Sequence, residues 1–343
     1  TMAVMLPVMM FIMNGVSVLI VWFGAKGVDG MTLQVGDMMA FMTYTMQIVF
    51  SFMMITMVSI MLPRAIVSVE RIDEILTSES VIEDPAQPEE PKPLQGEVKF
   101  DHVSFKYPGA EDYALRDISF TAAPGKTTAI IGSTGSGKST LLNLIPRFYD
   151  ATEGSITLDG VDVRNMKLTE LRDQMGYVPQ KAVLFSGTIA SNIKYAGNVS
   201  DEQMVQAAEI AQSVDFIEEK PEKYNSPIAQ GGSNVSGGQK QRLSIARAVA
   251  SNPKVYLFDD SFSALDYQTD VNLRKALAEH AENAAVIIVG QRIATVMHAD
   301  NIIVLKDGEV DGMGTHEQLL NSCETYREIA TSQLSAKELG LEG

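Results

Sequence analysis

Residues 132–140 read Gly132-Ser133-Thr134-Gly135-Ser136-Gly137-Lys138-Ser139-Thr140, and this stretch decides the fold of the polar part of the 343-residue chain. It follows a predicted buried strand at residues 127–131 and precedes the apolar helix start Leu141-Leu142. That is the Walker A pattern in its strand–loop–helix context. The loop N–H groups and the helix N-terminus attract phosphate oxygens. We therefore predict that this loop binds a nucleotide, with Lys138 on the β- and γ-phosphates and Ser139 as a Mg²⁺ ligand.

A second predicted strand, residues 255–259 (VYLFD), ends in a carboxylate. Four apolar residues deliver Asp259 to the carboxyl end of the strand, where ligands of open α/β sheets bind. We interpret Asp259 as the Walker B carboxylate, which holds Mg²⁺ directly or through water. Residues 97–105 alternate as a strand does, and residues 118–121 begin another. The fold class predicted from these patterns is an α/β P-loop NTPase.

The segment Val235 to Arg242 (VSGGQKQR) resembles the LSGGQ signature of ABC transporter ATPase domains, with Val replacing the first Leu. Tyr107 resembles the family's adenine-stacking aromatic residue. Gln180 resembles the Q-loop glutamine, which contacts Mg²⁺ and faces the membrane domains. Residues 263–266 (SALD) resemble the D-loop. The resemblance implies an ABC nucleotide-binding domain at residues 96–343, with an α-helical subdomain at about 180–250 that carries the signature.

The signature residues Ser236, Gly237, Gly238 and Gln239 open a predicted helix, whose N-terminus suits a γ-phosphate. In the family, the signature binds the nucleotide held by the opposite domain, so that two domains enclose two ATP molecules. The chain has one copy of each motif. The resemblance therefore implies a dimer with a second ABC half-transporter.

Two residues depart from the family pattern. The family usually places Glu, which polarises the attacking water, where this chain has Asp260, and His, which touches the γ-phosphate, where it has Gln291. The Asp side chain is one methylene shorter, and Gln cannot carry the imidazolium charge. We assign Asp260, Gln291 and Gln180 to the catalytic centre. The pair resembles the degenerate-site subunit of a heterodimeric bacterial multidrug ABC exporter, whose partner carries Glu and His; a homodimer with two slow sites is the alternative.

The first quarter of the chain has the composition of a membrane segment. Residues 1–62 include 42 of the hydrophobic class, and neither 1–25 nor 38–63 contains a charge. About 20 helical residues span the hydrocarbon core of a bilayer. We predict a partial transmembrane domain at residues 1–76, with helices at about 1–25 and 38–76, the second extending into the cytosol. A cleaved signal peptide fits poorly, and a buried hairpin of a soluble protein is the remaining alternative.

Charges near these helices indicate their orientation. Lys26 lies in the predicted loop with two acidic residues, whereas Arg64 and Arg71 follow the second apolar run. The positive-inside rule then places the C-terminal portion in the cytoplasm, with the hairpin in the plasma membrane. The lone Cys323 fits a reducing compartment. Residues 77–95, with several prolines among acids, predict an extended and solvated linker.

These features together indicate an ATP hydrolase coupled to transport, requiring ATP and Mg²⁺. Fourteen of the 19 methionines lie in residues 1–62, and flexible thioethers suit amphipathic drugs or lipids. The formal net charge of −16 argues against nucleic-acid binding. An exporter half normally has six spanning helices, so we expect this chain to be the C-terminal part of one. The alternatives are an ATP-gated membrane regulator with little hydrolysis and a homodimeric peptide or lipid exporter.

Overall fold

The computed structural model describes residues 2–78, 80–89 and 94–334, with side chains from residue 7 onward. The chain divides into two compact units, Thr1–Ser80 and Val81–Gly343. Each unit is described by itself.

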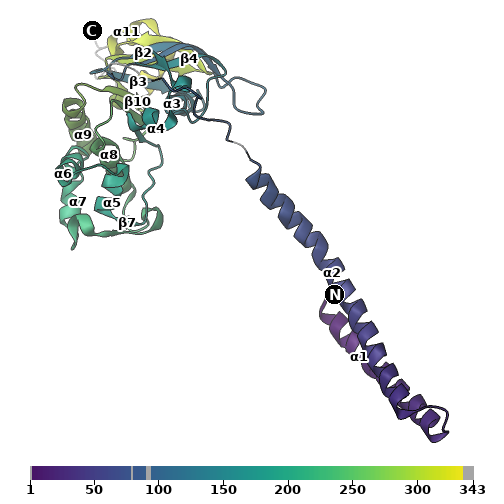
Figure 1. Cartoon of the computed structure of the whole chain (residues 1–343). Helices are drawn as coiled ribbons and strands as arrows, with labels where there is room; N and C mark the ends of the chain where they lie inside the picture. Colours follow the sequence, from purple (N-terminus) through teal and green to yellow (C-terminus); the bar gives the residue numbers. More distant parts are fainter. Residues whose placement is uncertain (1, 79, 90–93, 335–343) are drawn as a thin grey trace. The chain divides into compact units, whose positions relative to one another are not determined.

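The first unit is a hairpin of two helices, α1 (Met2–Asp29) and α2 (Val35–Leu76) (Figure 1). Both are long and apolar enough to cross a membrane. They run a few residues further into the connecting segment than the charge pattern suggested, and Gly30 N still donates to Lys26 O at 3.1 Å. The helices approach closely at Gly24, where an added Cβ would lie 2.6 Å from Sδ of Met38.

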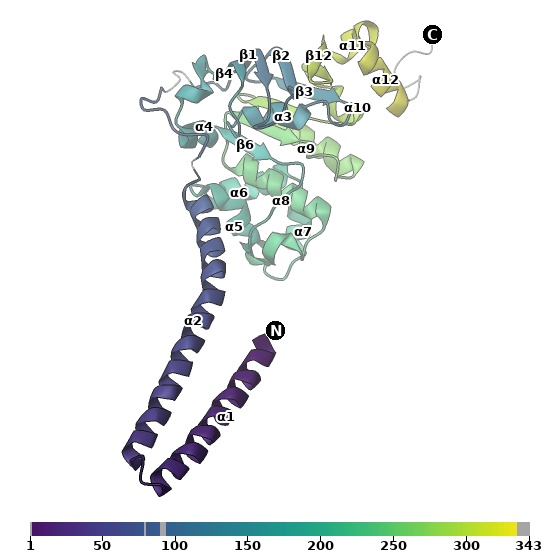
Figure 2. The same ribbon diagram turned by 90° about the vertical axis from the view of Figure 1, so that its right-hand side faces the viewer.

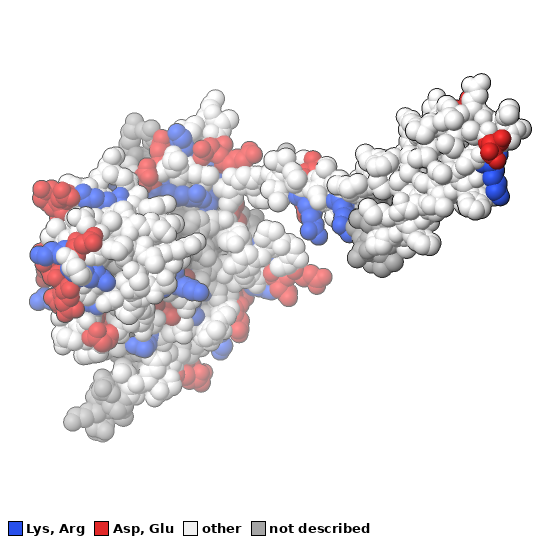
Figure 3. All heavy atoms as spheres, turned by 90° about the horizontal axis from the view of Figure 1, so that it is seen from below, with Lys and Arg blue, Asp and Glu red and all other residues white. Residues whose placement is uncertain are grey.

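Large apolar side chains of this hairpin face outward. Phe11, Trp22 and Phe41 are 80%, 61% and 66% exposed. Charged side chains lie at the loop tip of the hairpin and at the linker end of α2, and the surface between them is nearly uncharged (Figure 3). A contiguous apolar surface of this extent needs lipid or further helices around it. This exposure disfavours the buried core hairpin of a soluble protein.

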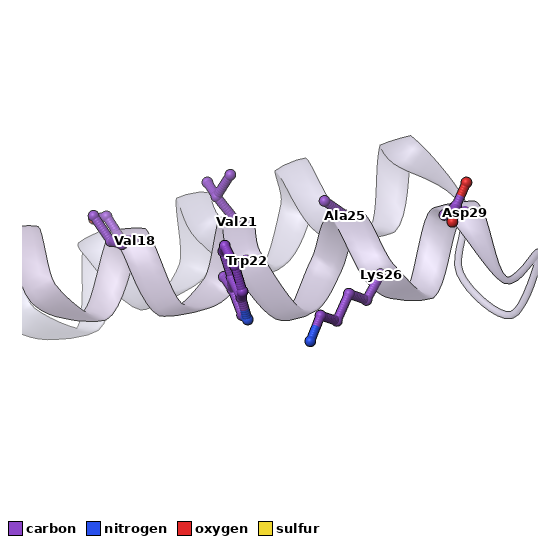
Figure 4. A pocket seen from close by; sticks show the side chains of 7 residues that line it. Val18, Val21, Trp22, Ala25, Lys26 and Asp29 are labelled. Atoms are coloured by element: carbon purple, nitrogen blue, oxygen red, sulfur yellow. The ribbon is translucent and has the colours of Figure 1, made fainter.

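Lys26 and Trp22 project from the same side of α1 near the loop (Figure 4). The Lys26 ammonium lies 5.1 Å from the centre of the Trp22 ring, within the range of a cation–π contact. Both side chains pair an apolar body with a polar tip, and such residues favour the level of the lipid headgroups. This end of α1 therefore has the chemistry of a membrane–water interface.

The second unit is built on a six-stranded, mostly parallel sheet. Its strands in order are β12 (Glu309–Gly314), β11 (Asn301–Lys306), β3 (Thr127–Gly132), β10 (Ala285–Val289), β9 (Val255–Asp259) and β6 (Met175–Val178). The strands β11, β3, β10, β9 and β6 are parallel, and β12 is antiparallel to β11. β3, β10 and β9 are buried almost throughout, as their continuous apolar sequences require. Their carboxyl ends consequently share one edge of the sheet.

A smaller antiparallel sheet and several helices complete the sheet-bearing part. The sheet has the order β2 (Leu115–Ala122), β1 (Val98–Phe105), β4 (Glu153–Leu158) and β5 (Val161–Asp162). The helices are α3 (Lys138–Leu144), η1 (Val163–Asn165), α4 (Leu168–Asp173), α9 (Tyr267–His280), α10 (Ile293–Val296), α11 (His316–Ser322) and α12 (Glu324–Gln333). One apolar core joins both sheets to α3, and a second lies between the large sheet and α10 to α12.

A helical region lies between β6 and β9 in sequence and gathers on one side of the unit (Figure 2). It contains β7 (Gly187–Thr188), α5 (Ile189–Ile193), η2 (Lys194–Ala196), α6 (Asp201–Ile210), α7 (Val214–Glu218), η3 (Lys223–Asn225), β8 (Pro227–Ile228), η4 (Gln230–Gly232) and α8 (Gly237–Ala250). Its apolar residues form a third core, in which α5 and α6 pack against α8.

Asp84 and Glu89, in the segment before β1, are exposed, as expected of a solvated linker, but both also hydrogen-bond to the rest of the second unit. Oδ1 of Asp84 accepts a 2.7 Å hydrogen bond from the backbone N–H of Leu168, at the start of α4. Glu89 exchanges two hydrogen bonds with Asn165, one from its own N–H and one to its carboxylate. The reason is that the first N–H groups of a helix need acceptors, and Asp84 supplies one from a distant part of the sequence.

Candidate nucleotide-binding site

The phosphate-binding loop runs from the end of β3 to the start of α3. Gly135 and Gly137 have φ of 85° and 96°, a left-handed conformation that favours glycine. Gly132 is required for space, because an added Cβ would lie 2.2 Å from the carbonyl oxygen of Leu305. At Gly137 a Cβ would lie 2.9 Å from the carbonyl oxygen of Ala114. The glycine spacing thus sets the curl that lets the loop N–H groups face a phosphate.

Lys138 is buried at the first turn of α3. Its Nζ donates to the backbone oxygens of Gly132 and Ser133 at 2.9 and 2.6 Å, and its distance to Oγ of Ser136 is 3.4 Å. Burial lowers the pKa of this ammonium group, and the nearby carboxylates of Asp259 and Asp260 oppose the shift. The carbonyl groups of the loop therefore hold the lysine side chain over the loop.

Ser139 and Asp259 meet across the edge of the sheet, where Oγ of Ser139 donates to Oδ1 of Asp259 at 2.9 Å. Two oxygen ligands at right angles around Mg²⁺ at about 2.1 Å lie about 3 Å apart, so the spacing fits two neighbouring ligands of one ion. Burial raises the pKa of Asp259, and the hydrogen bond from Ser139 opposes the increase. A divalent cation would favour the ionised carboxylate that burial disfavours.

Asp260 directly follows β9 with φ of 44°. Its Oδ2 accepts hydrogen bonds from Nε2 of Gln291 at 3.0 Å and from Nε2 of Gln180 at 3.3 Å. Burial raises the pKa of Asp260, while Gln180, Arg292, Lys138 and Gln291 oppose the shift. The three residues assigned to the catalytic centre therefore meet at one atom, because both glutamine side chains donate to the same oxygen of Asp260.

These groups line a cavity of about 490 Å³. Its lining contains the assigned residues Tyr107, Thr134, Gly135, Gly137, Lys138, Ser139, Thr140, Gln180, Asp259, Asp260 and Gln291. The Tyr107 hydroxyl lies 2.9 Å from Oγ1 of Thr140, which fixes the aromatic ring beside the start of α3. Sequence reasoning missed the cavity residues Tyr113 and Asp307, which come from connections between strands and belong to no local motif.

The structure does not bring the signature residues into this cavity. Ser236 caps α8, accepting from the N–H of Gln239 at 3.3 Å, while Oε1 of Gln239 accepts from the N–H of Ser236 at 3.0 Å. Ser236 and Gly237 are exposed. A capped, solvent-facing helix N-terminus leaves further N–H groups available to an anion from outside the domain.

Comparison with known proteins agrees with this geometry. Residues 115–263 match the family described as ABC transporter. A solved bacterial Atm1-family ABC exporter with ATP bound is 32% identical, with a TM-score of 0.75 over 95% of this chain and 56% of that chain. The second unit of this chain is therefore an ABC ATPase domain of the P-loop fold, preceded in sequence by apolar helices.

Curated relatives extend the likeness beyond the ATPase domain. An uncharacterized ABC transporter ATP-binding protein of Mycobacterium bovis is 44% identical over 98% of this chain and 59% of its own length. A Bacillus subtilis protein of the same description is 41% identical over 96% of this chain and 57% of its length. The ATP-dependent lipid A-core flippase of Haemophilus influenzae is 40% identical over 71% of this chain and 42% of its length. The chain spans somewhat more than half the length of the first two relatives.

Proposed function

We propose that this chain is the ATP-binding subunit of an ABC exporter in the cell membrane, with its ATPase domain in the cytoplasm. The exporter-type relatives and the outward-facing apolar surface of α1 and α2 support this function. The methionine-rich helices and the similarity to a lipid A-core flippase favour amphipathic lipids or drugs as substrates. ATP hydrolysis at the domain would drive their movement across the bilayer.

The cavity has the groups that Mg-ATP needs. The loop N–H groups and Lys138 suit the phosphates, and Tyr107 offers a ring to the adenine. Ser139 and Asp259 have the spacing of two Mg²⁺ ligands, with Gln180 as a third. Mg²⁺ would neutralise charge on the phosphates, while the protein positions them.

One observation carries the proposal of a slow site: Asp260 stands where a water-polarising carboxylate is needed and is bonded to Gln291 instead of a histidine. The Asp260 side chain is shorter than that of Glu and would hold its oxygens further from the phosphates. The neutral amide of Gln291 supplies less positive charge than the imidazolium of a histidine. Displacements of about 1 Å can cost roughly 100-fold in rate. We propose that this site binds Mg-ATP and hydrolyses it slowly.

The exposed signature serves a second site. Because Ser236 and Gly237 lie outside the cavity of their own domain, we propose that they complete the site of a second half-transporter. That partner would carry Glu and His at the positions matching Asp260 and Gln291, so that its site turns over normally. The functional unit would then be a heterodimer.

ATPase measurements on the purified membrane complex test this assignment. Asp260→Ala is expected to leave most of the activity, because the competent site belongs to the partner, whereas Gly237→Asp is expected to abolish it. Near-complete loss with Asp260→Ala would contradict the slow-site proposal. A complex of identical chains would instead support a homodimer.

The same pair of residues favours a second candidate, a membrane regulator that binds ATP with little hydrolysis. In that case Mg-ATP would bind but no substrate-stimulated ATPase activity would appear, either in this chain alone or in the assembly with the partner chain. Substrate-stimulated turnover in the assembly would exclude it.

A further inference from the structure

The loop that carries Gln291 is clamped by one side chain of the last described helix. Nε2 of Gln333 donates to the carbonyl oxygen of Gln291 at 2.8 Å, and Oε1 of Gln333 accepts from the N–H of Ile293 at 2.8 Å. One amide group therefore bridges both sides of Arg292. Such a two-point contact fixes the direction of the loop backbone as well as its position.

Backbone hydrogen bonds flank this point: the N–H of Gly290 donates to the carbonyl oxygen of Ile130, and the N–H of Thr295 to that of Arg292, both at 3.0 Å. Arg292 is the N-cap of α10 and makes no side-chain capping hydrogen bond. The N–H of Ile293 would otherwise be an unpaired donor at the start of that helix, and Gln333 supplies its acceptor. The clamp thus replaces a local cap with one from a residue 40 positions further along the chain.

The clamp itself rests on a rigid base. Tyr326 and Ala330 of α12 are fully buried in the core that also holds Ile293 and Val296 of α10. α12 lies beside α10 (Figure 2). Gln333 is the exposed last residue of this helix, so packing holds the helix and the two hydrogen bonds place the amide group.

The Gln291 side chain leaves the clamped backbone and reaches Asp260 at 3.0 Å. Because the Gln291 side chain is short, a small rotation of the backbone at Gln291 would break the hydrogen bond between its amide and the Asp260 carboxylate. We infer that Gln333 is a positioning residue, which acts through Gln291 to hold the amide against Asp260 in the nucleotide site. This inference rests on the proposed function, because it assigns the effect to turnover of ATP at the chain's own site.

A double-mutant cycle tests the inference in the full-length membrane complex. The variants are Gln333→Ala, Gln291→Ala and the double variant. Ser332→Ala is the matched control, since the hydrogen bond of Ser332 stays within α12, to the carbonyl oxygen of Ile329. Turnover at this site is followed by vanadate trapping of radiolabelled azido-ATP, because the label remains on the chain that holds the adenine. Binding of the same nucleotide without vanadate is measured in parallel.

Gln333→Ala is expected to slow trapping at least about tenfold, within the roughly 100-fold that a misplaced group can cost, while nucleotide affinity stays within about twofold. It should have no further effect in the Gln291→Ala background, and Ser332→Ala should match wild type. Equal slowing in both backgrounds would show a structural role independent of Gln291, and unchanged trapping would show no role; either result overturns the inference. If the wild-type chain binds azido-ATP but shows no trapping above background, the inference is overturned; if it takes no label even without vanadate, the proposed function fails instead.

Discussion

Nε2 of Gln291 lies 3.0 Å from Oδ2 of Asp260, although 31 residues separate the two in sequence. Their proximity follows from the sheet, because β9 and β10 are parallel neighbours with Asp259 in register with Val289. The two residues that depart from the family pattern therefore form a single contact. A change at one position alters the environment of the other.

Restoring both residues together is expected to increase turnover at the chain's own site. Asp260→Glu with Gln291→His should raise nucleotide trapping by roughly 10- to 100-fold, since it extends the carboxylate and adds a basic ring. Asp260→Glu alone should give a smaller gain, because Gln291 would still occupy the contact. A double variant no faster than wild type would contradict the assignment of the slow site to this pair.

The signature serine can be tested without removing its helix cap. Ser236→Asp keeps an N-cap acceptor for α8 but places a negative charge where a phosphate would bind. We expect loss of most ATPase activity of the complex with an unchanged melting temperature. Ser200→Asp is the matched control, because Ser200 and Gln203 form the same capping box at α6. Equal effects of the two substitutions would point to helix capping alone.

The half-buried Asp260 should also lower the stability of the folded state when it is ionised. Burial raises its pKa, so the folded state holds the proton more tightly than the unfolded state does. The shift is therefore destabilising above the folded-state pKa and has no effect below the unfolded-state value. Asp260→Asn is expected to raise the melting temperature of the nucleotide-free protein at neutral pH, with the gain shrinking as the solution is acidified. Melting curves across this pH range measure the effect, and a constant difference would contradict it.

Asp84 is expected to stabilise the start of α4 from outside the helix. Asp84→Ala removes the acceptor of the Leu168 N–H, and loss of a helix cap costs about 0.5–2 kcal/mol. Amide hydrogen exchange at Leu168 should accelerate, by roughly 5- to 30-fold for a loss of 1–2 kcal/mol. The neighbouring Glu83→Ala controls for the lost charge. Equal acceleration in both variants would show that the capping bond contributes nothing.

The core of the site could be predicted from sequence because local patterns determine it. Glycine spacing sets the loop after β3, and an apolar run ending in Asp259 places a carboxylate at the same edge of the sheet. Because the neighbouring strands are parallel, their carboxyl ends bring these groups together. The position of Ser139 near Asp259 thus follows from the order of residues within two short motifs.

The supporting contacts could not be predicted in the same way. Three side chains form hydrogen bonds with backbone groups that are distant in sequence: those of Asp84, Asp159 and Gln333. The Asp159 carboxylate accepts from three consecutive N–H groups, those of residues 95–97. A single polar side chain with a distant backbone partner leaves no periodicity or spacing in the sequence. Only the tertiary structure determines such pairs.

The hydrogen bonds that Lys138 makes to the loop also affect which ligands the cavity selects. Its ammonium already has backbone oxygens at 2.9 and 2.6 Å, so an incoming anion must exchange these contacts for its own. The net gain from one phosphate group is then small, because one set of hydrogen bonds replaces another. A chain of several phosphates recovers the difference by engaging the loop N–H groups, the lysine and a cation at once. The loop should therefore ignore free orthophosphate at concentrations where a nucleoside triphosphate saturates it.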